Sequence, residues 1–375
     1  MFIEGGAAEQ VAEADVKSKP QDTAIIDCDI HNYDAYGQKE FNDIIVRYLP
    51  QKWQRHHELF GRRGYTTGHY PRAQRNAARA DAWPPSGMPP GLDFEFTQEQ
   101  LLDTWDMDYG ILNPLTPAGS MLNAGYGAGI ASAINEYEIV EWVERDSRLR
   151  SSLVVNYEEA DLAVEEIHRV GDHKGFVQVL LLARTREPLG RRKYWPIYEA
   201  ALEHNLPIGI HFGGSVGNAI TGGGWPSYYI EDHGGMSQSF QAQVASFVCE
   251  GVFEHFPELR VVIIEGGFSW LPSLMWRLDQ SWSRLREEVP YLRRTPSEYI
   301  RDHFWLTTQP MEEPRQPRHF HQLMEQMNGG ERLMFATDYP HWDFDSPHRA
   351  VPLNLPGQMR RNIMAENART LYGLA

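Results

Sequence analysis

The sequence has few cysteines, an excess of acidic over basic residues, and no long apolar run. Its two cysteines, Cys28 and Cys249, are too few for a disulfide framework or a thiolate metal cluster. The 35 basic residues are outnumbered by 51 acidic ones, and the net charge of −16 argues against nucleic acid or an anionic membrane as the main partner. No apolar run approaches the ~18 residues that a membrane span needs. Residues 1–22 also lack the apolar segment of a secretory signal. We therefore expect a cytoplasmic protein with no nucleic-acid or membrane partner.

The rest of the chain is rich enough in apolar residues to build a large core. The whole chain has 375 residues, of which 42% are hydrophobic. We expect a flexible tail over residues 1–22 and one domain over 23–375, with strands starting near residues 25, 109, 151, 176, 207, 261, 304 and 333. Several of these strands are continuous apolar runs, which is typical of strands covered on both faces. Helix-sized segments between them predict a (β/α)8 TIM barrel, with an open doubly wound sheet as the alternative.

A long insertion follows the first predicted strand. Residues from about 33 to 100 are rich in Arg, Tyr, Trp and Pro. Because the preceding strand carries candidate ligands, we expect this insertion to cover the barrel mouth as a lid, although an oligomer contact would explain it equally well. Trp342 and Phe344, after the last strand, would add aromatic walls to a pocket for a small-molecule substrate.

Acidic and histidine residues follow four of the predicted strands. Asp29 and His31 end the first strand, His211 the fifth, Glu265 the sixth and Asp338 the eighth. In a barrel these strand ends meet at one mouth, where the buried charges are costly unless a cation compensates them. Carboxylate and imidazole ligands suit Zn²⁺, Mn²⁺ or Fe²⁺ better than Ca²⁺. The sequence therefore predicts one divalent ion, with Zn²⁺ preferred, held by the set Asp29, His31, His211 and Asp338.

The segments around these residues resemble the amidohydrolase superfamily. Ile26-Asp27-Cys28-Asp29-Ile30-His31, the strand ending in His211, Glu265-Gly266-Gly267 and Thr337-Asp338-Tyr339-Pro340-His341 are similar to the branch that includes aminocarboxymuconate-semialdehyde decarboxylase. The resemblance implies a TIM barrel with one divalent metal on the same four residues. Asp29 stands where the family usually has the first His of an H-x-H pair. Glu265 stands where many members have an acid/base His.

These departures decide the expected reaction. Because Glu265 replaces that His, we expect a metal-dependent hydrolase of a small amide, ester or lactone, in which Asp338 deprotonates a metal-activated water. A metal-dependent non-oxidative decarboxylase of an aromatic or unsaturated acid is the alternative, and a non-catalytic metal-binding barrel is the third possibility. His341 and His233 are the predicted proton donors, and Glu265 becomes the candidate if burial raises its pKa. We also expect a homodimer.

Overall fold

Eight parallel strands form the centre of the molecule. The computed structural model describes residues 24–32, 43–57, 77–214, 221–352 and 355–375, so the predicted tail over residues 1–22 lies outside the described residues. The strands pair in chain order from β1 to β8. Their bounds are β1 Ile26–Ile30, β2 Tyr109–Leu112, β3 Leu149–Val154, β4 Phe176–Leu182, β5 Ile208–His211, β6 Val261–Ile264, β7 Phe304–Thr307 and β8 Leu333–Met334. All eight predicted strands are therefore confirmed.

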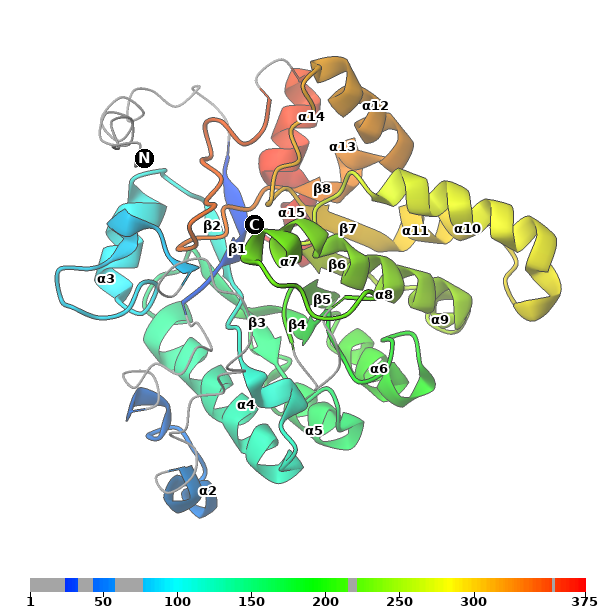
Figure 1. Ribbon diagram of the computed structural model, residues 1–375. Helices are drawn as coiled ribbons and strands as arrows, with labels where there is room; N and C mark the ends of the chain where they lie inside the picture. The colour runs from blue at the N-terminus through cyan, green and yellow to red at the C-terminus, as the bar shows by residue number, and fades with distance from the viewer. Residues whose placement is uncertain (1–23, 33–42, 58–76, 215–220, 353–354) are drawn as a thin grey trace.

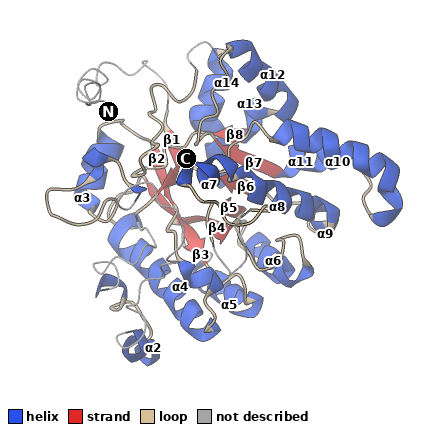
Figure 2. Ribbon diagram, in the orientation of Figure 1, coloured by secondary structure: helices blue, strands red, loops and turns tan. Residues whose placement is uncertain are grey.

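The sheet curls into a barrel because β1 also pairs with the segment that follows β8. The Cys28 amide donates to the Phe335 carbonyl at 2.9 Å, and the His31 amide donates to the Tyr339 carbonyl at 2.7 Å. Figure 2 shows the strands at the centre and the helices around them. Every residue of β4 is buried, as expected for a strand between a packed interior and a helical layer. The TIM barrel prediction is confirmed, and the open sheet is wrong.

The helices follow the strands as an outer layer (Figure 1). Local signals start several of them: the Asn123 side chain accepts the Tyr126 amide at the start of α4, and Thr295 with Glu298 forms a capping box on α11. The helices are α2 Gln51–His56, α3 Phe94–Thr97, α4 Ala124–Glu138, α5 Ala160–Val170, α6 Trp195–Glu203, α7 Tyr229–Gly235, α8 Ser237–Cys249, α9 Val252–His255, α10 Leu271–Leu285, α11 Pro296–His303, α12 Pro317–Met327, α13 Gly329–Arg332, α14 Gly357–Arg361 and α15 Asn367–Tyr372.

Shorter turns extend this layer. They are the 3-10 turns η3 Ala80–Ala82, η5 Pro117–Ser120, η7 Arg192–Tyr194 and η8 Arg286–Glu288, and the π-helical segments η4 Gln98–Asp103, η6 Ile139–Val143 and η9 Asn362–Glu366. A search of the described residues found no helix with the length and apolar character that crossing a bilayer requires.

The described parts of the insertion lie in two places. Helix α2 packs on α4 through the Trp53 side chain. The contact is so close that a Cβ added at Gly129 of α4 would stand 2.6 Å from the Trp53 ring. Residues 77–92 instead lie on the loop after β8, since Ala78 bridges His341 and the Arg79 amide donates to the Pro340 carbonyl at 2.9 Å. Gly91, with φ +79°, passes so close to β1 that a Cβ there would stand 2.2 Å from the His31 carbonyl oxygen. Residues 77–92 of the insertion therefore border the barrel mouth.

Candidate metal centre

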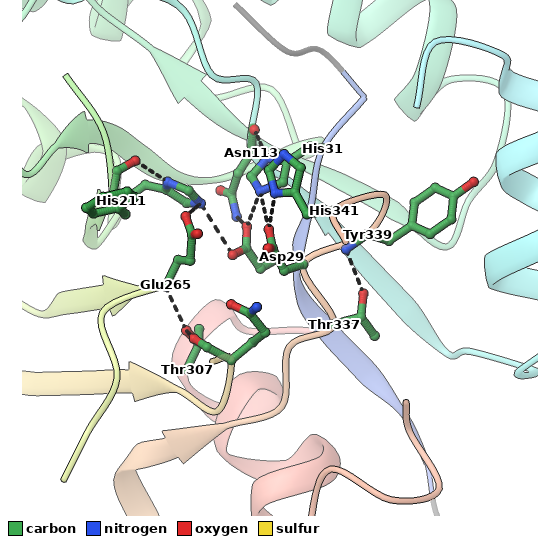
Figure 3. Close-up of polar contacts among 12 residues, drawn as sticks. Asp29, His31, Asn113, His211, Glu265, Thr307, Thr337, Tyr339 and His341 are labelled. Atoms are coloured by element: carbon green, nitrogen blue, oxygen red, sulfur yellow. Dashed lines mark hydrogen bonds and ion pairs between the residues drawn. The ribbon is translucent and has the colours of Figure 1, made fainter. Parts of the chain in front are cut away.

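The four predicted ligands converge at the C-terminal end of the barrel. Asp29 lies in β1, His31 directly follows β1, His211 ends β5, and Asp338 follows β8; all four side chains are at most 1% exposed. His31 Nε2 lies 2.8 Å from Asp338 Oδ1 and 3.4 Å from Asp29 Oδ1. His211 Nε2 lies 3.3 Å from Asp29 Oδ2. Figure 3 shows both imidazoles turned toward the Asp29 carboxylate, and their ring centres lie 4.9 Å apart.

Backbone carbonyls fix the orientation of both imidazoles. His31 Nδ1 donates to the Asn113 carbonyl at 2.8 Å, and His211 Nδ1 donates to the Phe212 carbonyl at 2.6 Å. Because Nδ1 of each ring donates to a carbonyl, Nε2 is the atom that faces the carboxylates and that can hold a proton or a cation there. A lone pair that faces carboxylate oxygens is repelled unless a proton or a cation stands between them. This is the arrangement by which proteins prepare histidines as metal ligands.

Three buried polar atoms of this cluster lack a hydrogen-bond partner among the described residues. They are Asp29 Oδ2, His211 Nε2 and Asp338 Oδ2. Leaving such atoms unpaired costs several kcal/mol in a dry interior, and more when they carry charge. One cation between them would satisfy all three at once. The donor set of two imidazoles and two carboxylates fits a divalent ion of the Zn²⁺ or Mn²⁺ kind.

His341 lies beside this cluster, as predicted. Its Nδ1 is 2.7 Å from Asp338 Oδ1, and its ring centre is 4.6 Å from that of His31. Burial alone would raise the pKa of Asp338, but the charge of His341 and the hydrogen bonds from His31 and His341 outweigh it and hold the pKa well below its usual range. Asp338 is therefore a carboxylate at every physiological pH.

Glu265 is the carboxyl group next to the cluster. Its Oε2 lies 3.5 Å from His211 Nε2, and its amide donates to Thr307 Oγ1 at 3.1 Å. Burial, followed by the charges of Asp338 and Asp29, raises the pKa of Glu265 well above its ordinary value. A raised pKa favours the protonated form of Glu265, which is the form that can donate a proton, so Glu265 stays a candidate proton donor.

His233 lies on α7, which Figure 1 shows over the central strands. Its Nε2 donates to Asp343 Oδ2 at 2.8 Å, and Gln309 Nε2 donates to the same oxygen at 2.9 Å. Burial alone would lower the pKa of His233, but the hydrogen bond to Asp343 and the charges of Asp343 and Asp338 raise it. This dyad stands within electrostatic reach of the ligand cluster, because Asp343 also contributes to the raised pKa of Glu265.

The two predicted substrate-binding aromatics occupy different surroundings. Trp342 stands half exposed beside α7, where its Nε1 donates to the Tyr229 hydroxyl at 3.4 Å and its ring centre lies 5.4 Å from that of His233. Phe344 packs against the insertion instead. The Arg79 guanidinium lies over the Phe344 ring at 4.2 Å, and the Tyr339 ring meets it edge-on. Phe344 thus joins the insertion to the loop after β8, whereas Trp342 faces α7.

An apolar hollow lies at the C-terminal ends of β3 and β4, the strands between the β1 and β5 ligands. It is small, with room for about one water molecule. Its lining includes Pro114, Val154, Tyr157, Leu180 and Leu182. Leu182 pairs with His211 across the sheet, so the hollow adjoins the ligand cluster.

The comparisons with known proteins agree with this geometry. A family model described as amidohydrolase matches residues 26–374. The chain belongs to the amidohydrolase family. Gamma-resorcylate decarboxylase of Rhizobium sp. (strain MTP-10005) is 24% identical over 299 residues, which cover 76% of this chain and 88% of that relative.

Two solved structures share the fold of this amidohydrolase. The dihydroxybenzoic acid decarboxylase from Polaromonas sp. JS666, with bound manganese and the inhibitor 2-nitroresorcinol, is 20% identical with a TM-score of 0.64, and the match covers 94% of this chain and 97% of that one. An amidohydrolase from Mycobacterium avium subsp. paratuberculosis K-10 is 19% identical with a TM-score of 0.71, over 94% of this chain and all of the other (100%).

These findings correct the predicted reaction of this amidohydrolase. The hydrolase prediction is wrong: the relative that matches over most of its length is a decarboxylase, and the findings favour the decarboxylase alternative. The error came from Glu265, which was interpreted as a missing acid. The structure buries this carboxyl among other carboxylates, which raises its pKa.

Sequence reasoning missed two residues of the amidohydrolase site. Asn113, which follows β2, donates from its amide to Asp29 Oδ1 at 2.8 Å. It follows an apolar strand just as the ligands do, so the same strand-end signal would have found it. Asp343 binds His233 although 110 positions separate them, and no local pattern predicts such a pair.

Proposed function

We propose that this amidohydrolase is a metal-dependent, non-oxidative decarboxylase of a hydroxylated aromatic carboxylic acid. The observation that carries the proposal is the cluster of unpaired buried ligand atoms beside Glu265, a carboxyl group whose pKa is raised. The names of the Rhizobium relative and of the Polaromonas structure support this reaction class.

The proposed cation is held by Asp29, His31, His211 and Asp338. When bound, it supplies a positive charge that attracts the carboxylate and a neighbouring hydroxyl of the substrate. We propose Zn²⁺ or Mn²⁺ because of the mixed imidazole and carboxylate donors. Elemental analysis of protein purified without chelators should find about one divalent ion per chain. Finding none, with none regained on adding Zn²⁺ or Mn²⁺, would contradict the proposed metal site.

Decarboxylation needs a proton donor and no oxidant. The bond between the ring carbon and the carboxylate breaks, CO₂ leaves, the electron pair stays on the ring carbon, and that carbon takes up one proton. Glu265 is the proposed donor, since it lies beside His211 and keeps its proton. His233, held by Asp343, is the second candidate, because its Nδ1 has no hydrogen-bond partner among the described residues.

The surroundings suit a planar substrate. Trp342 with Tyr229 offers aromatic faces on the side of α7, against which an aromatic ring can stack. We therefore keep Trp342 as a proposed substrate contact. Phe344, whose ring contacts Arg79 and Tyr339, also stays a proposed substrate contact.

The test is CO₂ release from gamma-resorcylate and other hydroxybenzoates by the metal-loaded protein. We expect release, and a loss of about 10²–10⁴-fold in kcat for Glu265→Gln if Glu265 is the donor. His233→Asn measures the second candidate, with the exposed His319→Asn as its matched control. Metal-loaded protein that releases no CO₂ from any of these acids would refute the proposed reaction and favour the non-catalytic alternative.

The predicted dimer and the lid role of residues 33–100 are also kept as proposals. Light scattering that gives the mass of one 43.1 kDa chain would refute the dimer. Arg79→Ala tests the lid: it should damage turnover more than thermal stability, because it loosens residues 77–92 from the loop after β8.

A further inference from the structure

A chain of buried hydrogen bonds crosses the barrel interior from the C-terminal helix to Asp29. The Tyr372 hydroxyl, at the end of α15, donates to Gln178 Oε1 at 3.0 Å. Gln178 Nε2 donates to Ser152 Oγ at 2.8 Å, and Ser152 Oγ donates to Asn113 Oδ1 at 2.5 Å. Gln178 Nε2 also donates directly to Asn113 Oδ1 at the longer distance of 3.2 Å. Asn113 Nδ2 then donates to Asp29 Oδ1 at 2.8 Å. The chain thus connects α15 with β4, β3, the residue after β2, and β1.

Every bond in this chain donates toward Asp29. The carboxylate can only accept, so Asn113 must turn its NH₂ group to Asp29 and its oxygen to Ser152. Ser152 must then donate its single proton to Asn113 and accept from Gln178. Donors aligned in one direction polarise one another, and here the alignment ends on an anion. The identity of each side chain is therefore constrained by its place in the chain.

The burial of these groups makes the chain costly to interrupt. Gln178, Ser152 and Asn113 are all 0% exposed, and Gln178 is the one polar side chain in the otherwise apolar strand β4. A polar group left unpaired at such a position loses its full hydration without compensation. An apolar residue in place of Gln178 would fill the interior equally well, so its presence calls for a role beyond packing.

We infer that this chain, defined as Tyr372, Gln178, Ser152 and Asn113, positions Asp29 for the cation. These residues are positioning residues, because only Asn113 touches a proposed ligand. The inference rests on the metal site of the proposed function and adds to it a dependence of metal affinity on α15. The effect should be largest next to Asp29 and should decrease with each further bond.

The test measures metal affinity by chelator competition, which needs no turnover. Ser152→Ala should raise the metal dissociation constant about tenfold. Tyr372→Phe, at a half-buried position that tolerates the loss of one oxygen, should raise it about two- to fivefold. Ser152→Thr keeps the hydroxyl and should restore most of the affinity. Tyr291→Phe is the matched control, since the Tyr291 hydroxyl also donates to a carbonyl, that of Cys249. This substitution should leave the metal affinity unchanged.

The outcomes separate this inference from the proposed function. If the wild-type protein binds the metal and the variants bind it equally well, even with lowered melting temperatures, the chain is merely structural and the inference is refuted. An equal loss in Ser152→Ala and Ser152→Thr would refute it too, because the hydroxyl would then be irrelevant. If the wild-type protein binds no metal, the proposed metal site fails and this inference falls with it.

Discussion

Glu138 on α4 gives the fold a dependence on pH that can be measured. Its carboxyl group is fully buried. Asn32 Nδ2 donates to its two oxygens at 2.7 and 2.9 Å, and Ser151 Oγ donates to one of them at 3.0 Å. Burial raises the pKa of Glu138 from 4.5 to about 8, against the smaller lowering effect of these hydrogen bonds. Glu138 is therefore protonated in the native protein at neutral pH.

The sign of the effect follows from proton binding. Above about pH 4.5 the unfolded chain loses the Glu138 proton, whereas the native protein keeps it up to about pH 8. The unfolded state then binds fewer protons, so the stability present at acid pH is lost as the pH rises through this interval. At about 1.4 kcal/mol per pH unit, the loss reaches on the order of 5 kcal/mol. For a chain of this length that is a melting-temperature shift of about 6 °C.

Glu138→Gln should remove this contribution. Glutamine cannot ionise, and its amide can still accept from Asn32 and donate to Ser151, whose own proton can turn to the Ser152 carbonyl at 3.4 Å. Melting temperatures measured from pH 5 to 8.5 should converge at the acid end, with the variant several degrees more stable at the alkaline end. The exposed Glu325→Gln is the control, and its curve should follow the wild type. Parallel curves for Glu138→Gln and wild type would refute the reasoning.

Three further predictions concern the site. The Asp27 carboxylate accepts hydrogen bonds from the amide and the hydroxyl of Thr337 at 2.9 and 2.6 Å. Asp27→Ala should therefore lower the free energy of unfolding by about 3 kcal/mol and the melting temperature by about 4 °C. An unchanged melting temperature would contradict this. If His233 donates the proton, Asp343→Asn should move the alkaline limb of the pH–rate profile to lower pH, because the pKa of His233 falls without that carboxylate; a stationary limb would exclude His233. Glu265 has φ +53°, so Glu265→Gly should be about 1 kcal/mol more stable than Glu265→Ala, the reverse of the usual order; calorimetry of the two variants decides.

The barrel, and the meeting of the four candidate ligands at its mouth, were predictable because their signals are local. An apolar run such as β4 encodes a buried strand by itself, and a polar residue directly after it, such as His211, must lie at the barrel mouth once the fold is known. Glu265 was located by the same rule, but its protonation was not, because the pKa depends on carboxylates brought together by three different strands. Asp343 and the interior chain depend on contacts between distant segments that no spacing records.

The backbone at the mouth gives an independent argument that Glu265 and Asp338 are kept for chemistry. Both follow strands directly, and both adopt the left-handed region, with φ +53° and +60°, where a side chain costs about 1–2 kcal/mol. Glycine or asparagine would relieve much of this cost, and the amide bonds to Thr307 Oγ1 and the Asp29 carbonyl would remain. A carboxyl side chain in this conformation therefore carries a stability cost that packing does not explain. Strain of this kind is typical of positions where the direction of one side chain matters. Here both carboxyl groups point at the same place, the space between His31 and His211 that the proposed cation would fill.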